Sequence, residues 1–241
     1  MIYPDWPLQG VVGALSTTRQ GGVSAAPFDG FNLAYHVGDT PQAVAQNRAQ
    51  LQAEVSLPIV WLEQVHGNTV IHVDDDYDIA SLPQADAIFT RSAQFALAIM
   101  TADCLPVLIA SENGQEIAAV HCGWRPLAAD ILAKTLSYFQ TPVSQLHVWL
   151  GPAIGPQAFE VGEEVFEQFV ALSQIHSHAF IRQENGHYLA DIHLLARQRL
   201  SELGVTSVFA QAHCTVTHPQ YYFSYRRDRR CGRMASLIWR K

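Results

Sequence analysis

The apolar positions of this chain fall into short, nearly continuous runs that are typical of β-strands. These runs are rich in Val, Ile, Leu and Phe, and they occupy residues 58–62, 69–73, 86–90, 95–100, 105–110, 116–121, 145–150, 206–210 and 234–239. A strand with one face in water would alternate apolar and polar residues, and several of these runs do not. We therefore expect sheets that are covered on both faces.

Helical periodicity appears in fewer places. It is clearest at 126–139, 161–172 and 191–203, with a weaker pattern at 41–54. Pro126 suits the first position of a helix, Glu163 and Glu164 favour the positive end of the second helix, and Asp191 is a suitable N-cap for the third. Gly204 is expected to end that third helix.

Strands outnumber helices and do not alternate with them strictly. This arrangement predicts a mixed α/β (α+β) fold in which largely buried mixed sheets are flanked by helices. No repeat or linker divides the chain, so we expect one layered domain over residues 1–241.

Composition and charge favour a globular protein. Of the 241 residues, 49% are hydrophobic and 15% charged, and the formal net charge is -7. An acidic chain has no general attraction to nucleic acid or anionic lipid, and the one basic cluster is RRDRR at 226–230. We expect no nucleic-acid or membrane partner. The amino terminus lacks a secretory pattern, so we expect a cytoplasmic protein; the sequence does not define its oligomeric state.

Three metal-capable side chains stand at the ends of predicted strands: His66, Cys104 and His121. Two imidazoles and a thiolate suit Zn²⁺, and Cu²⁺ also binds such donors. Three protein ligands leave a fourth position for water or substrate, which is typical of a catalytic site. The four cysteines show no paired spacing, so their thiols are expected to be reduced.

Spacing alone leaves other interpretations open. In one of them the two histidines simply end strands while Cys104 packs in the core. If Cys122 supplied a fourth ligand, the metal would be structural and the protein a binding module. If Cys104 were a nucleophile and His121 its base, the protein would be a metal-free amidase or deamidase.

Eight stretches together resemble the YfiH-type laccase-domain family, also described as multicopper polyphenol oxidase-like. They are STTRQGGVSAAPFDGFNLAYHVGD at 16–39, WLEQVHG at 61–67, ADAIFT at 85–90, MTADCLPVLI at 100–109, AAVHCGWR at 118–125, WLGPAIGPQAFEVG at 149–162, ADIHLLARQRL at 190–200 and FSYRRDRRCGRMASLIW at 223–239. The resemblance implies a YfiH or cytotoxic-necrotizing-factor-like fold, with His66, Cys104 and His121 as the metal ligands. Pro126 and Cys122 depart from the residues usual in the family.

The resemblance also implies an activity. It points to a purine nucleoside phosphorylase acting on adenosine, inosine, guanosine and methylthioadenosine, with adenosine deaminase activity and a link to peptidoglycan precursor editing. Copper-dependent polyphenol oxidation is the older interpretation. A blue-copper oxidase would want clustered histidines, and the one near-pair, His176 and His178, is expected in a solvated loop.

Phosphorolysis needs an anion site, and arginine binds phosphate through its planar fork. Arg19, in the TTRQGG stretch, and Arg125, beside a predicted helix start, are the candidates. Asn32 and Tyr225 are candidate hydrogen-bond partners for the base or ribose.

Deamination needs a carboxylate that moves protons beside the metal. Asp103 adjoins Cys104, and Glu63 precedes His66 by three residues. Asp103 has a second interpretation, in which it orients a ligand histidine through a hydrogen bond.

Overall fold

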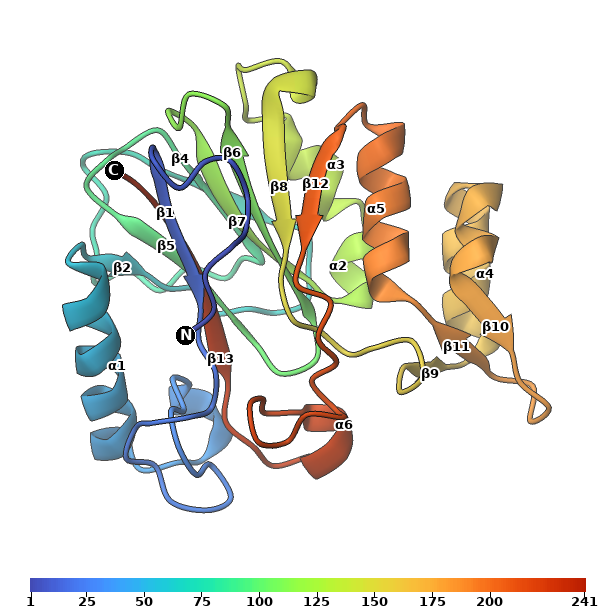
Figure 1. Ribbon diagram of the computed structural model, residues 1–241, viewed down its shortest axis with the longest axis horizontal. Coiled ribbons are helices and arrows are strands. Elements are labelled where there is room, and N and C mark those ends of the chain that lie inside the picture. The colour runs from blue at the N-terminus through green and yellow to red at the C-terminus, as the bar shows by residue number, and fades with distance from the viewer.

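Two stacked sheets form the centre of the molecule, and helices cover both outer faces (Figure 1). The computed structural model describes all residues 1–241. Its helices are α1 (Pro41–Val55), α2 (Trp124–Ala128), α3 (Ile131–Leu136), α4 (Glu163–Leu172), α5 (Ile192–Glu202) and α6 (Tyr225–Asp228), with 3-10 turns η1 (Tyr35–Val37), η2 (Val143–Gln145) and η3 (Gln174–Ala179).

The strands form three sheets. They are β1 (Val12–Ser16), β2 (Ile59–Val60), β3 (Val70–Val73), β4 (Ala87–Thr90), β5 (Ala96–Thr101), β6 (Leu105–Ser111), β7 (Ile117–Cys122), β8 (Leu146–Leu150), β9 (Glu160–Val161), β10 (Phe180–Arg182), β11 (Tyr188–Ala190), β12 (Ser207–Ala210) and β13 (Met234–Arg240). The six-stranded sheet has the order β12-β8-β6-β7-β4-β3, the four-stranded sheet β1-β13-β5-β2, and the small sheet β10-β11-β9. Each of the two large sheets contains parallel and antiparallel pairs.

The continuous apolar strands have a direct structural cause. In β6, Val107 and Ile109 belong to the core beneath the helices α2, α3 and α5, while Leu108 and Ala110 belong to the core between the two large sheets. Successive side chains of a strand point to opposite faces, so a strand with both faces covered is apolar throughout. The layered mixed α/β fold predicted from the sequence is confirmed.

All nine predicted strands are present, and four further strands were missed. β1 carries Gly13, whose missing Cβ leaves room for the Trp239 ring to lie against the backbone. β9, β10 and β11 are only two or three residues long. Runs this short carry too few residues for alternation to be recognised.

The predicted helix 126–139 is wrong in its continuity. It is divided into α2 and α3 at Asp130, whose φ of 61° lies in the left-handed region. The carboxylate of Asp130 makes two hydrogen bonds to Arg199 of α5, at 2.8 and 2.7 Å. α2 begins at Trp124, so Pro126 is its third residue and Arg125 lies inside the helix, not before it.

The remaining helix signals are confirmed. Asp191 caps α5 by accepting a hydrogen bond from Leu194 N at 2.9 Å, and Gly204 follows the helix with φ 87°. Glu163 and Glu164 lie in the first turn of α4. No helix is both long and apolar enough to cross a lipid bilayer.

The expectation of two solvated histidines at 176 and 178 is half wrong. His178 is exposed, but His176 is buried in η3, and its Nδ1 makes a 3.0 Å hydrogen bond with the carbonyl oxygen of Phe169. The periodic packing of η3 against α4 buries one histidine and leaves the other outside.

Candidate metal site and its cavity

The fold brings His66, Cys104 and His121 together at one end of the six-stranded sheet. Cys104 directly precedes β6, His121 lies near the end of β7, and His66 lies in the turn before β3. β7 is antiparallel to both β6 and β4, and β3 is parallel to β4, so these termini meet at the same sheet end. One donor atom from each of the three residues lies within 4.8 Å of the others.

Asp86, which directly precedes β4, joins two of these residues. It is fully buried, and its Oδ1 lies 2.8 Å from Nδ1 of His121. The same carboxylate accepts hydrogen bonds from the backbone N–H groups of Val65, His66 and Gly67, at 3.3, 3.0 and 2.7 Å. One buried carboxylate therefore orients the His121 ring and shapes the loop that carries His66.

The backbone around the donors is locally strained. His66 has φ 58° and Asp103, next to Cys104, has φ 95°, in a region that residues other than glycine seldom occupy. Such conformations cost about 1–3 kcal/mol each and occur often at functional sites. At Gly123 an added Cβ would lie 3.0 Å from Cys104 Sγ and 3.4 Å from His66 Cδ2, so glycine makes room for both donors.

The charges in the cluster favour a thiolate. Burial alone would raise the pKa of Cys104, but attraction to and hydrogen bonding with His121 and His66 outweigh it and lower the pKa to about 6. Burial alone would lower the pKa of His121, but Cys104 and Asp86 raise it to about 9. The thiolate is the form of cysteine that binds metal ions.

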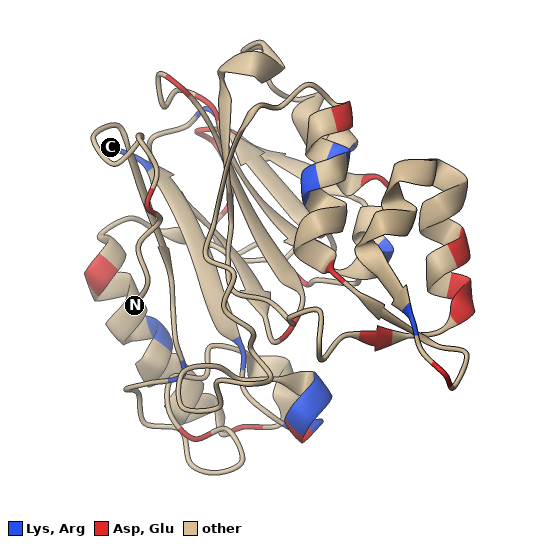
Figure 2. Ribbon diagram, turned by 45° about the vertical axis from the view of Figure 1, so that its right-hand side comes forward, with Lys and Arg blue, Asp and Glu red and all other residues tan.

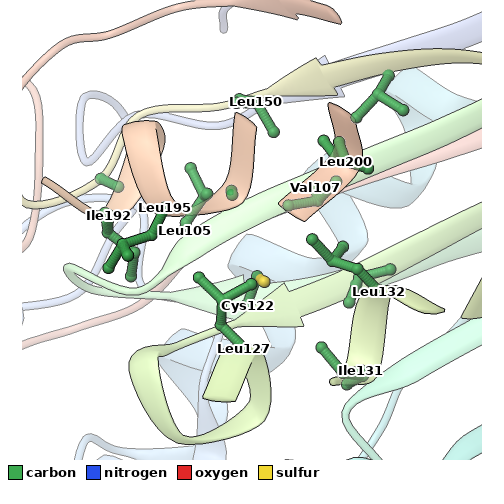
Figure 3. Packing of buried hydrophobic residues seen from close by; sticks show 14 of the residues in the cluster. Leu105, Val107, Cys122, Leu127, Ile131, Leu132, Leu150, Ile192, Leu195 and Leu200 are labelled. Carbon is green, nitrogen blue, oxygen red and sulfur yellow. The ribbon is translucent and has the colours of Figure 1, made fainter. Parts of the chain in front are cut away.

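Cys122 does not join the donor group. Its neighbour His121 points into the cluster, and successive residues of β7 point to opposite faces. Cys122 is fully buried in the core under α2 and α3, near Leu127 and Leu132 (Figure 3). Burial raises the pKa of its thiol far above the usual value. The interpretation of Cys122 as a fourth ligand that closes the metal site is wrong.

The donor set fits a tetrahedral divalent ion. Cys104 Sγ lies 3.8 Å from His66 Nε2. Zinc bonds of about 2.0–2.1 Å to nitrogen and about 2.3 Å to sulfur place two such donors roughly 3.6 Å apart at a tetrahedral angle. Asp86 occupies Nδ1 of His121, so its Nε2 is the atom left for a ligand bond. His66 is exposed and Cys104 partly exposed, so the group is open on one side.

That open side faces a cavity of about 840 Å³, which is lined by residues of β5, β7 and β9, of the helices α2, α4, α5 and α6, and of the loops between them. This volume lies within the range of roughly 300–1,000 Å³ that is typical of small-molecule sites. Apolar residues line much of one side, namely Trp124, Ile154, Phe159, Val161, Val165 and Ile192.

Three of the residues predicted to serve catalysis or binding line this cavity: Arg125, Asp103 and Tyr225. Arg125 makes no ion pair and stacks on its neighbour Trp124, with its Cζ 4.3 Å from the ring centroid. Asp103 accepts 2.6 Å hydrogen bonds from Thr215 Oγ1 and from Arg226 N. It contacts neither ligand histidine, so the interpretation of Asp103 as their orienting carboxylate is wrong; Asp86 has that contact.

Glu63 and Arg19 do not line the cavity. Glu63 is exposed and accepts a hydrogen bond from Gln84 at 3.1 Å. Arg19 pairs with Asp29 at 3.0 Å and stacks on Phe223. Glu63 was chosen for its spacing from His66 and Arg19 for its place in the TTRQGG stretch, and both side chains make their contacts outside the cavity.

Asn32 does not line the cavity either. It is fully buried, and its amide bonds to Ala34, to the Asp39 carboxylate and to the backbone N–H of Arg233. These contacts hold the 31–39 loop against the segment that leads into β13, so Asn32 is the turn residue that its motif also allowed.

Sequence reasoning missed four residues of this site: Asp86, His36, Arg226 and Arg233. For Asp86 a signal existed, since it is an isolated carboxylate at the start of an apolar strand, where burial requires a partner. The other three come from η1, from α6 and from the segment before β13, and their approach to the cavity depends on tertiary packing.

Comparisons with known proteins identify the family of this chain. The sequence model of a family described as "Multi-copper polyphenol oxidoreductase laccase" matches residues 13–241. The chain belongs to this family.

Curated relatives carry a more specific name. "Purine nucleoside phosphorylase YfiH" of Shigella flexneri is 49% identical over 241 residues, covering 99% of this chain and 98% of the relative. The Escherichia coli (strain K12) protein of the same name is 48% identical with the same coverage.

Among solved structures, the Neisseria meningitidis protein NMB0706 has a TM-score of 0.95 and 42% identity, with 100% of this chain and 98% of that chain covered. The Bacillus licheniformis protein YfiH has a TM-score of 0.92 and 28% identity, covering 95% and 93% of the two chains.

Proposed function

We propose that this chain is a metal-dependent purine nucleoside phosphorylase that uses a nucleoside and inorganic phosphate as substrates. The observation that carries the proposal is the open group of His66, Cys104 and His121 on the wall of a cavity large enough for a nucleoside. The printed names of the curated relatives support the same activity.

In phosphorolysis an oxygen of hydrogen phosphate forms a bond to C1′ of the ribose while the bond from C1′ to the purine nitrogen breaks. The electrons of that bond leave with the purine, which takes up the proton of hydrogen phosphate, so the products are ribose 1-phosphate and the free base. A divalent ion held by the three donors would supply Lewis acidity beside the reacting groups. Zn²⁺ suits the donor set, and Cu²⁺ is the alternative.

The residues of the chain supply binding and orientation. The apolar wall that includes Trp124 and Phe159 offers a surface for a purine ring. Tyr225 offers a hydroxyl at the cavity, and Arg125 a guanidinium without an ion pair. We extend the proposal to adenosine, inosine, guanosine and methylthioadenosine as substrates and to adenosine deamination, with Asp103 as the carboxylate of the cavity nearest in sequence to a ligand. Because Cys104 must be reduced, we place the enzyme in the cytoplasm.

The test is a product analysis with protein of known metal content. We expect adenosine to yield adenine and ribose 1-phosphate only when phosphate is present, and inosine to appear if the deamination proposal holds. Chromatography separates the three products. Absence of adenine with fully zinc-loaded and fully copper-loaded protein would contradict the phosphorylase proposal.

A second candidate function follows from the contacts of Cys104. The thiolate lies beside His121, and His121 is held by Asp86, which is the arrangement of a thiol hydrolase with nucleophile, base and orienting carboxylate. In that function His66 has no necessary role. His66→Ala should therefore abolish metal binding and phosphorolysis if the first proposal is right, and should preserve amidase activity if the second is.

The matched control for this variant is His178→Ala. His178 is exposed and does not line the cavity, so its replacement should change neither metal content nor activity.

A further inference from the structure

The cavity has two ends with different charge. β9 and the starts of α4 and α5 line one end, where Glu160 and Glu164 contribute carboxylates and the other lining residues are largely apolar. η1 and the segment before β13 line the other end, where Arg233 contributes a guanidinium and His36 an imidazole. Figure 1 shows α4 and α1, which follows η1, on opposite sides of the molecule, and Figure 2 shows acidic residues at β9 and α4.

Arg233 is held firmly but has no carboxylate partner. Its Nη1 donates to the carbonyl oxygens of Cys231 and Gly232, at 2.9 and 3.0 Å, and its backbone N–H donates to Asn32 at 2.9 Å. The Nε and Nη2 groups make no hydrogen bond within the protein. Its Cζ lies 5.9 Å from the ring centroid of Tyr225, which also lines the cavity. The guanidinium is thus fixed on one side and free on the other.

Arg48 adds a second unpaired cation behind this end. Its guanidinium lies between two rings, 3.9 Å from the centroid of Trp61 and 4.6 Å from that of Tyr35, and its Nε donates to Leu33 O. Burial is the main cause that lowers the pKa of Arg48 to about 10, and no carboxylate pairs with it.

The charges of Arg233 and Arg48 also act on the His36 imidazole. Burial and the charges of Arg233 and Arg48 lower the pKa of His36, and only Glu63 acts in the opposite direction. Glu63 is exposed and lies outside the cavity. Cationic groups that lack carboxylate partners in a cleft favour an anion there.

We propose that inorganic phosphate binds at this end of the cavity, between the free edge of the Arg233 guanidinium, the His36 imidazole and the Tyr225 hydroxyl. The proposal rests on the proposed function, whose second substrate it positions. The purine then occupies the apolar end, and C1′ lies between the two, beside the metal ligands.

The two arginines favoured by sequence motifs are poorer phosphate sites. Arg19 is outside the cavity and already paired with Asp29. Arg125 lies on α2, which packs against α4, so it shares its end of the cavity with Glu164, whose charge opposes a phosphate dianion.

The test measures phosphate and nucleoside separately with the zinc-loaded enzyme. We expect Arg233→Gln to raise the KM for phosphate roughly 10- to 100-fold, because a charge-assisted fork contact is lost, and to leave the KM for inosine within about threefold. His36→Gln should raise the phosphate KM by a smaller factor. Arg182→Gln, at an exposed arginine outside the cavity, is the matched control, and its phosphate KM should stay within about twofold of the wild-type value. Arg125→Gln should raise the phosphate KM less than Arg233→Gln does.

Direct calorimetric titration of the zinc-loaded protein with inorganic phosphate, without nucleoside, gives the second readout. Binding that weakens in Arg233→Gln and is partly restored in Arg233→Lys supports the site. If Arg233→Gln loses its zinc or its cooperative thermal transition, the phosphate KM and phosphate affinity of His36→Gln and Arg233→Lys test the site instead.

Failure of this proposal and failure of the proposed function are distinguishable. A wild-type enzyme that performs no phosphorolysis but binds phosphate in an Arg233-dependent way contradicts the function and supports the site. An unchanged phosphate KM in Arg233→Gln, a larger effect in Arg125→Gln, or no phosphate binding by the wild-type protein overturns the site.

Discussion

Replacing Asp86 with Asn changes one oxygen for an amide nitrogen at the point where two metal ligands are held. Oδ1 contacts His121 Nδ1 and His66 N, at 2.8 and 3.0 Å, while Oδ2 accepts from Gly67 N and Val65 N, at 2.7 and 3.3 Å. An Asn side chain can present oxygen to only one of these pairs. Its NH₂ group must face donors on the other side.

Each of the two orientations of the introduced amide weakens either the stability of the fold or the binding of metal. If the NH₂ faces Gly67, one short hydrogen bond to a charged acceptor is lost and a buried donor is left without a partner, which lowers the free energy of unfolding by about 3–5 kcal/mol. If the NH₂ faces His121, Nδ1 of that ring must become an acceptor, and the proton moves to Nε2, the atom expected to bind metal. Loss of such an orienting contact weakens metal affinity by about 10- to 100-fold.

Two measurements check this reasoning. Competition with a chromophoric chelator gives the zinc affinity, and urea unfolding of the zinc-free protein gives the stability. Asp103→Asn is the matched control, because Asp103 contacts Thr215 and Arg226 but no ligand histidine. Zinc affinity that is unchanged in Asp86→Asn, or lowered only in Asp103→Asn, would refute the role assigned to Asp86.

Three further predictions concern other parts of the structure. Gly123→Ala should lower zinc affinity by about 10-fold or more, because its Cβ would press on Cys104 Sγ at 3.0 Å; chelator competition measures this, and Gly10→Ala, with no atom within 4 Å, is the control that should show no change. Glu116 is buried, which would raise the pKa of its carboxyl, but hydrogen bonds from Gln140, Thr141 and Arg91 lower it below the ordinary value of 4.5. Because the folded-state pKa is the lower one, the wild type should be more stable than Glu116→Gln by about 1–3 kcal/mol near pH 7, and this advantage should disappear as the pH falls below 4.5 through the folded-state pKa. Urea titrations between pH 3 and pH 7 test this, and a difference that does not depend on pH would contradict it. Leu108→Ala, in the fully buried core between the sheets, should lower the free energy of unfolding by about 2–5 kcal/mol, whereas Leu82→Ala, at a side chain that is 59% exposed, should change it by less than about 0.5 kcal/mol; equal effects would contradict the two-sheet core.

Local sequence patterns predicted most of the elements. Each of the nine apolar runs became a strand, because a strand buried on both faces needs apolar residues at every position. Asp191 was recognised as a helix cap, since a cap depends on residues only three apart. The break at Asp130 was missed, because its carboxylate bonds to Arg199, a residue 69 positions away.

The candidate site residues likewise fall into two groups, those whose role the sequence predicted and those whose role it did not. His66, Cys104 and His121 were identified from motifs at strand ends, and the structure brings their donor atoms within 4.8 Å. Arg19, Asn32 and Glu63 belong to motifs just as distinct, yet their side chains lie outside the cavity. A motif indicates that a residue has a specific role, but it does not show whether that residue binds a ligand or stabilises a loop.

From the sequence alone came nine of the thirteen strands, most helix ends and the three donor residues, all of which depend on residue type and on neighbours a few positions away. Tertiary structure alone decided that Asp86 orients the donors, that Cys122 faces the core and that Arg233 reaches the cavity. The physical reason is that these roles depend on strand register and on the stacking of two sheets. Register joins residues such as Asp86 and His121 across 35 positions, a distance at which periodicity along the chain carries no information.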